Sequence, residues 1–337
     1  MLVSVVIPTH NGRGRLAECL GAVFEAAGEC RGDKVEIIVV DDASTDGTAE
    51  WCRGNWKAVH LVEDAANKGF AGAANAGIAA AGGEWVALLN DDAVAERGWI
   101  SGARLDEQDS RVGAVASRIM KLGQADTIES CGDGYTVAGL AYHRQTTGPG
   151  QGGAGGAGAV RVFSACAAAA FYRREALEQA GGFEERFESH YEDVDLGFRL
   201  NLLGWRTVYE GESACRHRSA SSYGELSFKK IRNSARNSET VFFSCVPARL
   251  LFVYVWPHLA AVAAQAVLRI RQGGLIAFAA GKADFVTSLG FVINRRRRIQ
   301  KTRSRPDGEL RKMIDANWVR LHILDRARAG SRPRLAK

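Results

Sequence analysis

Acidic residues gather at three places along the chain, in patterns that suit chemistry on a phosphate-bearing ligand. The pair Asp41-Asp42 follows one apolar run, the pair Asp91-Asp92 follows another, and residues 192–195 read Glu-Asp-Val-Asp. Carboxylate oxygens are the hard ligands that Mg²⁺ or Mn²⁺ prefers when it holds phosphate oxygens. A carboxylate that faces a cleft can also act as a general base toward a hydroxyl. The pattern therefore favours divalent-metal chemistry, in which His217 becomes an attractive ligand in combination with Asp92.

Each acidic group also has an ordinary structural explanation. Ser44 and Asp46 supply a helix N-cap after the first pair, and the second pair is compatible with an acidic turn. Acidic side chains at the start of a helix, as at 192–195, suit the helix dipole, and a lone histidine such as His217 is most often a surface residue. Two acidic residues directly at a strand end exceed what capping requires, and a third carboxylate exceeds what the dipole needs. We therefore favour a functional interpretation of Asp41-Asp42, whereas for Asp91-Asp92 taken alone the functional and structural interpretations are even.

The residues around these groups predict the elements that position them. Short apolar runs at 3–7, 36–40, 59–62 and 85–89 alternate with helical patterns, among them an alanine-rich helix at 71–81. Continuous apolar strands that alternate with helices predict a mostly parallel sheet covered on both faces. In such a sheet the ligand lies outside the carboxyl ends of the strands. The polar residues that follow those ends are Thr9, His10 and Asn11, then Asp41 and Asp42, and then Asn90, Asp91 and Asp92.

Composition limits the classes of protein that the chain can be. The 337 residues are 46% hydrophobic and 24% charged, and the mean hydropathy of −0.14 excludes a bundle of membrane helices. The apolar run at the start stops at Pro8 and has no basic segment before it, so it predicts a first strand rather than a signal peptide. The seven cysteines are scattered without a C-x-x-C pair, which argues against a zinc site or a disulfide framework and favours the reducing cytosol.

The carboxyl-terminal region has a different character. Residues 295–337 hold 15 Lys/Arg and 4 Asp/Glu, so this tail is strongly basic while the body before it is acidic, within a whole-chain net charge of +6. Apolar segments at 241–268 and 273–293 precede the run Arg295 to Arg298. We therefore expect two domains, one at 1–224 that carries the acidic groups, and a helical, basic region at 225–337.

Three arrangements of residues 225–337 remain open. Interrupted apolar helices beside a polybasic stretch fit a protein that lies on an anionic membrane surface, which is the arrangement that we favour. A soluble helical cap or a homodimer interface ranks second. A transmembrane hairpin ranks third, because Pro257, His258, Lys282 and Asp284 interrupt the apolar segments. Nucleic acid is not an expected partner, since the basic residues are not interleaved with aromatic ones.

A glycine-rich stretch, GPGQGGAGGAG at 148–158, is too poor in side chains to pack. It predicts a flexible surface loop, with a mobile flap over the site as the alternative. After it, residues 162–172 predict an apolar strand and residues 193–203 predict a helix.

Five segments, taken in order, resemble one known family. They are VSVVIPTHN from residue 3, EIIVVDDASTDGT from 36, NKGFAGAANAGIAAAGGEWVALLNDDA from 67, AGGFEERFESHYEDVDLGFRLNLLGWRTVYEGES from 180 and HRSAS from 217. Together they are similar to the family 2 inverting glycosyltransferases, and among these to the rhamnosyltransferase-like bacterial enzymes of cell-surface polysaccharide assembly, over roughly residues 3–222. The resemblance implies an α/β fold of the GT-A nucleotide-diphospho-sugar transferase type, with a mostly parallel central sheet, flanking helices and a C-terminal helical region.

The resemblance also implies the ligands and the residues that contact the donor. The donor would be a nucleotide sugar, dTDP-rhamnose or a UDP-sugar, and the acceptor a glycan or a lipid-linked glycan. The positions that hold base and ribose are matched by Thr9, Asn11 and Asp41, and the segment that packs beside the nucleotide is matched by Asn67, Gly69 and Asn75.

The groups that would carry the reaction follow from the same resemblance. Asp91 and Asp92 match the second and third positions of a D-x-D-type motif, with Asp92 as a ligand of Mg²⁺ or Mn²⁺. His217 matches the histidine that completes the metal shell, and Asp193 matches the catalytic base. The implied reaction is a single displacement in which Asp193 takes a proton from the acceptor hydroxyl. The metal neutralises charge on the departing nucleotide diphosphate.

Three positions depart from the family pattern. Asn90 stands at the first carboxylate position of the D-x-D-type motif, and Glu184-Glu185 stands where the family usually has Asp-Glu. The segment Ser164-Ala165-Cys166 replaces the usual glycine-bearing strand near the acceptor site. The last departure leaves the identity of the acceptor open.

Two other functions compete with this one. A Rossmann dehydrogenase is excluded, because no G-x-G-x-x-G follows the strand at 3–7. A non-catalytic nucleotide-sugar-binding module at the membrane is the alternative, and the joint retention of Asp41, Asp92 and Asp193 argues against it. We expect an enzyme in the cytoplasm, at the inner face of the plasma membrane.

Overall fold

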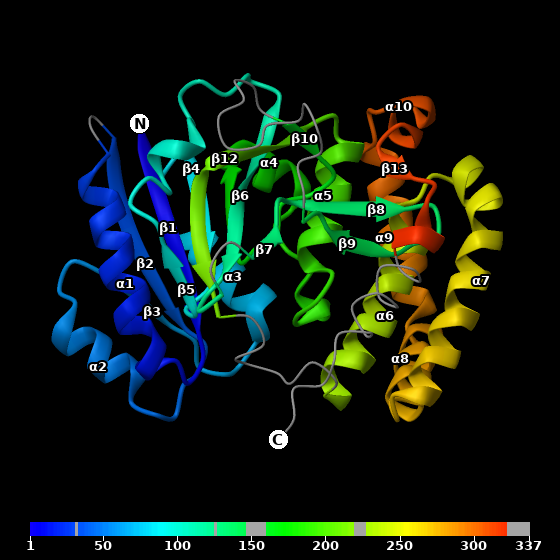
Figure 1. Ribbon diagram of the computed structural model, residues 1–337, viewed down its shortest axis with the longest axis horizontal. Helices are drawn as coiled ribbons and strands as arrows, with labels where there is room; N and C mark the ends of the chain where they lie inside the picture. The colour runs from blue at the N-terminus through cyan, green and yellow to red at the C-terminus, as the bar shows by residue number, and fades with distance from the viewer. Residues whose placement is uncertain (31–32, 125–126, 146–159, 219–226, 322–337) are drawn as a thin grey trace.

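The apolar runs near the amino terminus fold into alternating strands and helices, as their spacing predicts (Figure 1). The computed structural model describes residues 1–30, 33–124, 127–145, 160–218 and 227–321. The α-helices are α1 (Arg13–Gly28), α2 (Thr48–Asn55), α3 (Gly69–Ala80), α4 (Arg174–Ala180), α5 (Glu192–Leu202), α6 (Phe228–Cys245), α7 (Ala248–Arg271), α8 (Leu275–Thr287), α9 (Leu289–Thr302) and α10 (Asp307–Arg311), with 3₁₀ turns η1 (Ser101–Ala103) and η2 (Glu185–Phe187). The strands are β1 (Leu2–Thr9), β2 (Lys34–Asp41), β3 (His60–Glu63), β4 (Trp85–Leu89), β5 (Ala93–Ala95), β6 (Val112–Lys121), β7 (Ile128–Ser130), β8 (Asp133–Thr136), β9 (Ala141–His143), β10 (Val160–Val162), β11 (Ala169–Arg173), β12 (Arg206–His217) and β13 (Ile314–Asp315).

The central sheet is mixed, with a parallel part built from the amino-terminal strands. Its order is β10-β12-β6-β11-β4-β1-β2-β3, and β5 and β7 pair with β12 and β6 off this path. Strands β3, β2, β1 and β4 are parallel neighbours, whereas β11 runs antiparallel between β4 and β6. The α/β fold is confirmed, and its parallel strands are the ones that the apolar runs predict.

Helices cover both faces of this sheet. Val5 of β1 packs in one core cluster with Leu16 of α1, and its neighbour Val6 packs on the opposite face with Ala74 of α3. Successive side chains of a strand point to opposite faces, which is why a continuous apolar run buries both sides. The small residues of α3 let it approach closely: a Cβ on Gly77 would lie 2.2 Å from Cγ1 of Val6.

The carboxyl-terminal helices share a core with the rest of the molecule. Strands β8, β9 and β13 form a second, three-stranded sheet, and α6 to α10 lie beside it (Figure 1). Tyr135 of β8 and Phe198 of α5 belong to one buried cluster with Val241 and Phe242 of α6. The helical region at the C-terminus is therefore present, and it packs directly against the sheet-bearing part of the chain.

Polar residues inside the apolar C-terminal segments form contacts with neighbouring helices. Lys282 of α8 forms an ion pair with Glu239 of α6, and Asp284 lies 2.6 Å from the Nε atom of Arg232. Glu239 also lies 2.9 Å from Nε2 of His258 in α7. These contacts tie α6, α7 and α8 together.

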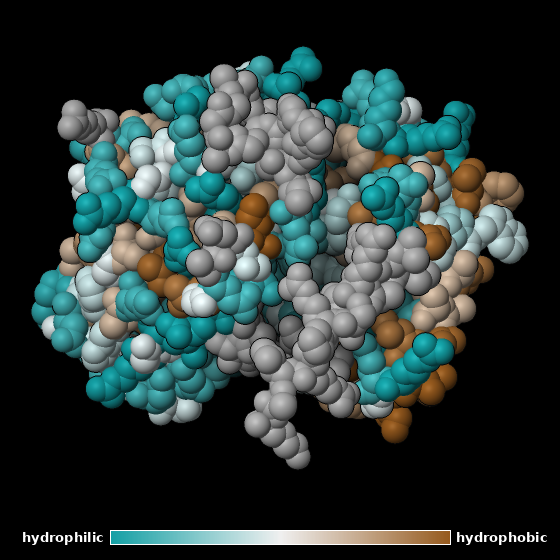
Figure 2. Space-filling view, in the orientation of Figure 1, coloured by the Kyte–Doolittle hydropathy of each residue, from teal (hydrophilic) through white to brown (hydrophobic). Residues whose placement is uncertain are grey.

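The outer side of α7 and α8 is apolar and exposed. Phe252 and Trp256 of α7 are 81% and 71% exposed, and Ile276 of α8 is 78% exposed. Figure 2 shows hydrophobic side chains gathered over this edge of the molecule. In the described part of the chain, α7 is the one unbroken helix long and apolar enough to cross a bilayer, with 22% of that stretch buried; α8 and α9 pass the same test together but are bent by 65°.

Three details differ from the sequence expectations or lie beyond the structure. The expected strand at 162–172 divides into β10 and β11, because the intervening residues turn past the site and Ser164 bridges to Asp133. The run of four arginines is not a single exposed patch: the Arg295 side chain is 3% exposed and lies 2.6 Å from Asp195. Arg296 donates to two backbone carbonyls, which leaves Arg297 and Arg298 exposed. The glycine-rich stretch at 148–158 lies outside the described residues.

Candidate active site at the carboxyl ends of the strands

Strand register brings three of the expected donor residues to one edge of the sheet. Thr9, the last residue of β1, pairs with Asp41, the last residue of β2. Strand β4 lies on the other side of β1 in parallel register, so the turn that follows it carries Asp91 and Asp92 to the same edge. The loop after each strand thus opens onto a common site, as parallel α/β sheets require.

Asp41 and Asp42 are adjacent in sequence but serve different purposes. Both are buried, and one carboxylate oxygen of Asp41 has no hydrogen-bond partner among the described residues. The Asp42 carboxylate instead accepts hydrogen bonds from the backbone N–H groups of Lys68 at 2.6 Å and Gly69 at 2.9 Å. Asp42 therefore fixes the turn before α3, while Asp41 is left with capacity to bind a ligand. Sequence reasoning did not assign this role to Asp42.

The three expected asparagines hold loops at the rim of the site. The Asn11 Oδ1 atom accepts a hydrogen bond from the backbone N–H of Thr45 at 2.8 Å. The Asn67 Oδ1 atom accepts from Gly69 N–H at 3.2 Å. The Asn75 Oδ1 atom accepts a hydrogen bond from the N–H of Phe183 at 2.8 Å, and its Nδ2 atom donates one to the C=O of Phe183 at 2.9 Å. The structure brings Asn11 and Asn67 to the loops that follow β1 and β2, whereas Asn75 lies against the segment after α4, and all three side chains are engaged by the backbone.

Asp91 is tied to the loops around it. Its Oδ2 atom accepts from the Thr9 hydroxyl at 2.7 Å and lies 2.9 Å from Nη2 of Arg15. Burial raises the pKa of Asp91, and the hydrogen bonds from Arg15 and Thr9 oppose that rise. Arg15 is a residue that the sequence did not single out, because it lies within α1, far from the acidic motif.

Asp92 and His217 lie together, as expected for a metal site. Strand β12 pairs with β5 so that His217 faces Ala93 in register, and His217 Nε2 lies 3.1 Å from Asp92 Oδ1. Glu129 of β7, which the sequence did not reveal, lies 3.1 Å from His217 Nδ1. Burial would lower the pKa of His217, but Asp92 and Glu129 raise it to about 9.

The chemistry of this donor set fits a divalent ion. A carboxylate oxygen suits both Mg²⁺ and Mn²⁺, and an imidazole nitrogen beside it suits Mn²⁺ better than the harder Mg²⁺. An ion bound at Nε2 would take the place of the proton on that nitrogen, which faces Asp92. A metal-bound histidine usually donates its second N–H to a carboxylate, and Glu129 is in place to accept it.

The acidic residues at the start of α5 have different surroundings. Asp195 is fully buried and lies 2.6 Å from Nη2 of Arg295 and 2.8 Å from Nε of Arg199. Burial would raise the pKa of Asp195, but these guanidinium groups lower it overall. Burial and the charge of Asp193 raise the pKa of Glu192 well above its usual value, which favours a neutral carboxyl group.

Asp193 is the partly exposed member of this group. Its Oδ1 accepts from Val194 N–H at 2.8 Å and its Oδ2 from Ala167 N–H at 3.3 Å. Desolvation and the negative charge of Asp133 raise the pKa of Asp193 to about 6, and the charge of His143 opposes that rise. The raised pKa makes the Asp193 carboxylate a stronger proton acceptor than an ordinary aspartate.

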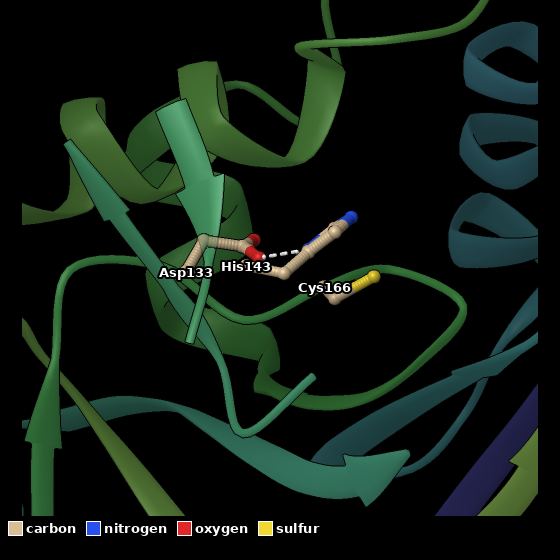
Figure 3. Close-up of side chains that lie close together, drawn as sticks. All are labelled: Asp133, His143 and Cys166. Atoms are coloured by element: carbon tan, nitrogen blue, oxygen red, sulfur yellow. Dashed lines mark hydrogen bonds and ion pairs between the residues drawn. The ribbon is translucent and has the colours of Figure 1, made fainter. Parts of the chain in front are cut away.

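A cluster beside Asp193 comes from three separate segments. Figure 3 shows Asp133 of β8, His143 of β9 and Cys166 of the loop between β10 and β11. Asp133 Oδ1 lies 2.7 Å from His143 Nδ1; desolvation lowers the pKa of His143, but Asp133 raises it to about 9. One ligand atom from each residue lies within 4.8 Å of the others, a donor set that can also hold a metal ion. Sequence reasoning noted Cys166 and missed Asp133 and His143.

Backbone groups connect the Asp193 side of the site to the Asp92 side. Ala167 donates its N–H to Asp193, and the next residue, Ala168, accepts from the N–H of Asn90 at 3.0 Å. Asn90 precedes the Asp91-Asp92 pair. The loop between β10 and β11 thus contacts both Asp193 and the turn that carries Asp91 and Asp92.

Solved structures share this arrangement of sheet and helices. Staphylococcus aureus TarS 1–349 in complex with UDP-GlcNAc covers 93% of each chain with a TM-score of 0.57 and 15% sequence identity. A mannosyltransferase from Pyrobaculum calidifontis in complex with GDP-Man and Mn²⁺ covers 84% of this chain and 86% of its own, with a TM-score of 0.52 and 19% identity. The fold is that of a GT-A-type sugar transferase.

The sequence itself shows the family. Residues 4–181, more than half of the chain, match the family described as Glycosyl transferase family 2, and the chain belongs to that family. The protein is therefore a glycosyltransferase.

Curated relatives match over part of their own length. The N-acetylglucosaminyl-diphospho-decaprenol L-rhamnosyltransferase of Mycobacterium tuberculosis is 30% identical over 219 residues, which are 56% of this chain and 68% of that protein. The pre-mycofactocin glycosyltransferase of the same organism is 30% identical over 62% of this chain and 41% of its own. A match to a Sinorhizobium fredii protein, y4gI, spans only 25% of that relative.

Proposed function

We propose that the protein is an inverting glycosyltransferase that moves a sugar from a nucleotide diphosphate to an acceptor hydroxyl, with Asp193 as its base. The observation that carries the proposal is the contrast within α5. Asp195 is neutralised by two arginines and Glu192 favours its neutral form, whereas Asp193 is partly exposed and has a pKa near that of a working base. General-base catalysis is most effective when the pKa of the base lies near the operating pH.

The donor in this proposal is dTDP-rhamnose or a UDP-sugar. The buried Asp41 oxygen that lacks a partner among the described residues would accept a hydrogen bond from the base or ribose. The activity for which the M. tuberculosis relative is named, rhamnosyl transfer, supports the sugar, and the TarS complex with UDP-GlcNAc supports uridine as the base. Thr9, Asn11 and the turn before α3 would shape the rest of this subsite.

Asp92 and His217 would hold a divalent ion, Mg²⁺ or Mn²⁺. When bound, the ion supplies charge neutralisation at the departing diphosphate. Glu129 would orient the imidazole through the Nδ1 contact at 3.1 Å, and Arg15 with Asp91 would fix the adjoining turn. The Mn²⁺ in the P. calidifontis complex supports this assignment.

Asp193 would act on the acceptor side. Its carboxylate accepts the proton of the acceptor hydroxyl while the hydroxyl oxygen bonds to the anomeric carbon. The bond from that carbon to the diphosphate oxygen breaks as the new bond forms, and the nucleoside diphosphate departs with the electron pair. One displacement from the opposite face inverts the configuration.

We further propose a lipid-linked glycan acceptor in polysaccharide assembly and a place at the inner face of the plasma membrane. The acceptor named for the M. tuberculosis relative and the exposed apolar side of α7 and α8 support this. In this proposal residues 1–224 form the catalytic domain, and residues 225–337 form a helical region that caps it and meets the membrane. A homodimer through the same apolar side is the competing arrangement.

Transfer by the parent protein tests the reaction class. The protein is incubated with Mn²⁺, a panel of dTDP- and UDP-sugars and a polyprenyl-diphosphate sugar, and NMR reads the anomeric configuration of the product. Inversion is expected, and a product with retained configuration would contradict the single displacement. Donor binding in a thermal-shift assay without transfer to any acceptor would favour a non-catalytic binding module.

The variant Asp193→Asn tests the base. It preserves shape but removes the proton-accepting charge, so transfer should fall by ~10²–10⁴-fold. Donor affinity, measured by thermal shift with Mn²⁺, should stay near the parental value because its proposed ligands lie elsewhere. Glu192→Gln and Asp195→Asn are the controls: parental transfer by Asp193→Asn together with a collapse in either control would move the base to that neighbour.

A further inference from the structure

The backbone that leads into α5 is strained. Glu188, His190 and Tyr191 have φ values of 59°, 68° and 71°, in the left-handed region that favours glycine, and none of them is glycine. Tyr191 directly precedes the helix that carries Asp193, and its carbonyl accepts the hydrogen bond of Asp195 N–H at 2.8 Å. Such conformations persist only where the surrounding structure imposes them, and they cluster at functional sites.

One buried side chain from the C-terminal region imposes this conformation. Asn237 of α6 is fully buried, and its Nδ2 atom lies 3.1 Å from the carbonyl oxygens of Phe187 and Ser189 and 2.7 Å from that of His190. The two amide hydrogens are therefore shared among three backbone carbonyls within residues 187–190. Arg236 adds a hydrogen bond at 2.8 Å to the carbonyl of Arg186.

The opposite side of the same loop contacts the donor edge. The carbonyl of Glu188 accepts from Ala71 N–H of α3 at 3.1 Å, and a Cβ on Gly69 would lie 3.2 Å from that oxygen. The loop 187–191 is thus held between the turn that Asp42 anchors and helix α6. Any change in its path would move the base relative to the donor edge.

We propose that Asn237 is a positioning residue for the transfer reaction. By holding three carbonyls of loop 187–191, it sets the distance from the Asp193 carboxylate to the donor subsite. The C-terminal helices then belong to the active site as well as to the surface. This inference rests on the proposed function, in which Asp193 is the base.

The test compares Asn237→Ala with Asn233→Ala. Asn233 lies one turn earlier on the same helix and is also buried, and its Nδ2 has no hydrogen-bond partner among the described residues, so it is a matched control. Misplacement of a catalytic group by about 1 Å costs roughly 10²-fold, and we expect that loss in kcat for Asn237→Ala. Donor affinity with Mn²⁺ should change less than about threefold, because the Asn237 side chain bonds loop 187–191 and Arg236 and none of the residues proposed to bind the donor. Asn233→Ala should keep parental kcat.

A double-mutant cycle separates positioning from a general structural role. If Asn237 acts through Asp193, adding Asn237→Ala to Asp193→Asn should cause little further loss of transfer. Asn237→Ser keeps one hydrogen-bond donor and should give an intermediate kcat. This variant provides the test if Asn237→Ala folds poorly. Parental kcat in Asn237→Ala, equal losses in both alanine variants, or full additivity with Asp193→Asn would overturn the proposal. Parental transfer by Asp193→Asn alone would instead contradict the base assignment of the proposed function.

Discussion

At the scale of single residues, the environment of each acidic side chain decides its ionisation. Asp193 and Asp195 lie two positions apart on one helix, yet desolvation and Asp133 raise the pKa of the first while two arginines lower that of the second. The sequence shows only that acidic residues are adjacent. Their different surroundings come from Asp133 and Arg295, which lie far away along the chain.

The acid limb of the pH–rate profile should report Asp193. A base must be deprotonated to work, so kcat/KM should fall as pH decreases through about 6, where the pKa of Asp193 lies. An unperturbed aspartate would give a limb near 4. Because the His143 charge opposes the rise in this pKa, His143→Gln should move the limb to higher pH. A limb that stays in place in His143→Gln would contradict this electrostatic account.

Glu129 should determine how tightly the metal binds. Glu129→Gln removes the carboxylate that faces His217 Nδ1, and loss of such a partner typically lowers metal affinity by ~10–100-fold. Asp92→Ala should weaken binding more than His217→Ala does, because only the carboxylate offsets the charge of the ion. Calorimetric titration of Mn²⁺ into apo protein measures these affinities. Glu63→Gln, at an exposed strand residue, is the control, and equal affinities in Glu63→Gln and Glu129→Gln would remove Glu129 from the site.

At the scale of elements, the sequence predicts some parts of the site and misses others. Continuous apolar runs such as 3–7 and 85–89 reveal the parallel strands, and strand ends then locate Asp41 and Asp92. Strands β7, β8 and β9 are three or four residues long, too short for a periodic pattern to identify. The site residues that they carry, Glu129, Asp133 and His143, are therefore found only when the strands are folded together.

The arginine run illustrates the same limit for charges. Four consecutive arginines predict an exposed basic patch, but on a helix consecutive residues point in different directions. Arg295 consequently enters the core beside Asp195 while Arg297 and Arg298 stay outside. A long-range ion pair of this kind leaves no mark in the local sequence.

Helix α7 should determine membrane attachment. Phe252 and Trp256 are one turn apart on the same exposed side, and burying a large apolar side chain contributes roughly 1.5–3 kcal/mol. The double variant Phe252→Ser/Trp256→Ser should therefore lose about 10²-fold or more in affinity for anionic vesicles, measured by co-sedimentation. Phe228→Ser, at an exposed phenylalanine of α6, should bind like the parent.

Two further results decide between the arrangements of α7. Arg297→Ser/Arg298→Ser should weaken vesicle binding at low salt more than at high salt, because exposed charges are screened. Parental vesicle binding by the Phe252/Trp256 variant would argue against attachment through this face. A change from dimer to monomer in that variant, seen by light scattering without vesicles, would favour the homodimer.

At the scale of the whole molecule, a buried ion pair joins the C-terminal helices to α5, the helix that carries Asp193. Arg295→Gln should lower the free energy of unfolding by ~3–5 kcal/mol, because it leaves Asp195 buried with less compensation. Arg297→Gln, two positions away and exposed, should change it by less than about 0.5 kcal/mol. Urea unfolding at pH 7 measures both. Similar stabilities of the two variants would contradict the role of the pair.

The pH dependence of that difference has a definite sign. The native-state pKa of Asp195 is lowered, so the pair stabilises the fold above the unfolded pKa of about 4 and loses its contribution as pH falls further. The gap between parent and Arg295→Gln should therefore shrink below about pH 4.

The peptide link between Ala167 and Ala168 has a consequence for how specificity can change. Ala167 holds the Asp193 carboxylate and Ala168 holds the chain at Asn90, and both do so with main-chain atoms. Adjacent Cα atoms are always about 3.8 Å apart, so covalent geometry sets this part of the span whatever side chains the loop carries. A substitution at Cys166 would therefore alter the cluster with Asp133 and His143 while leaving both main-chain contacts available.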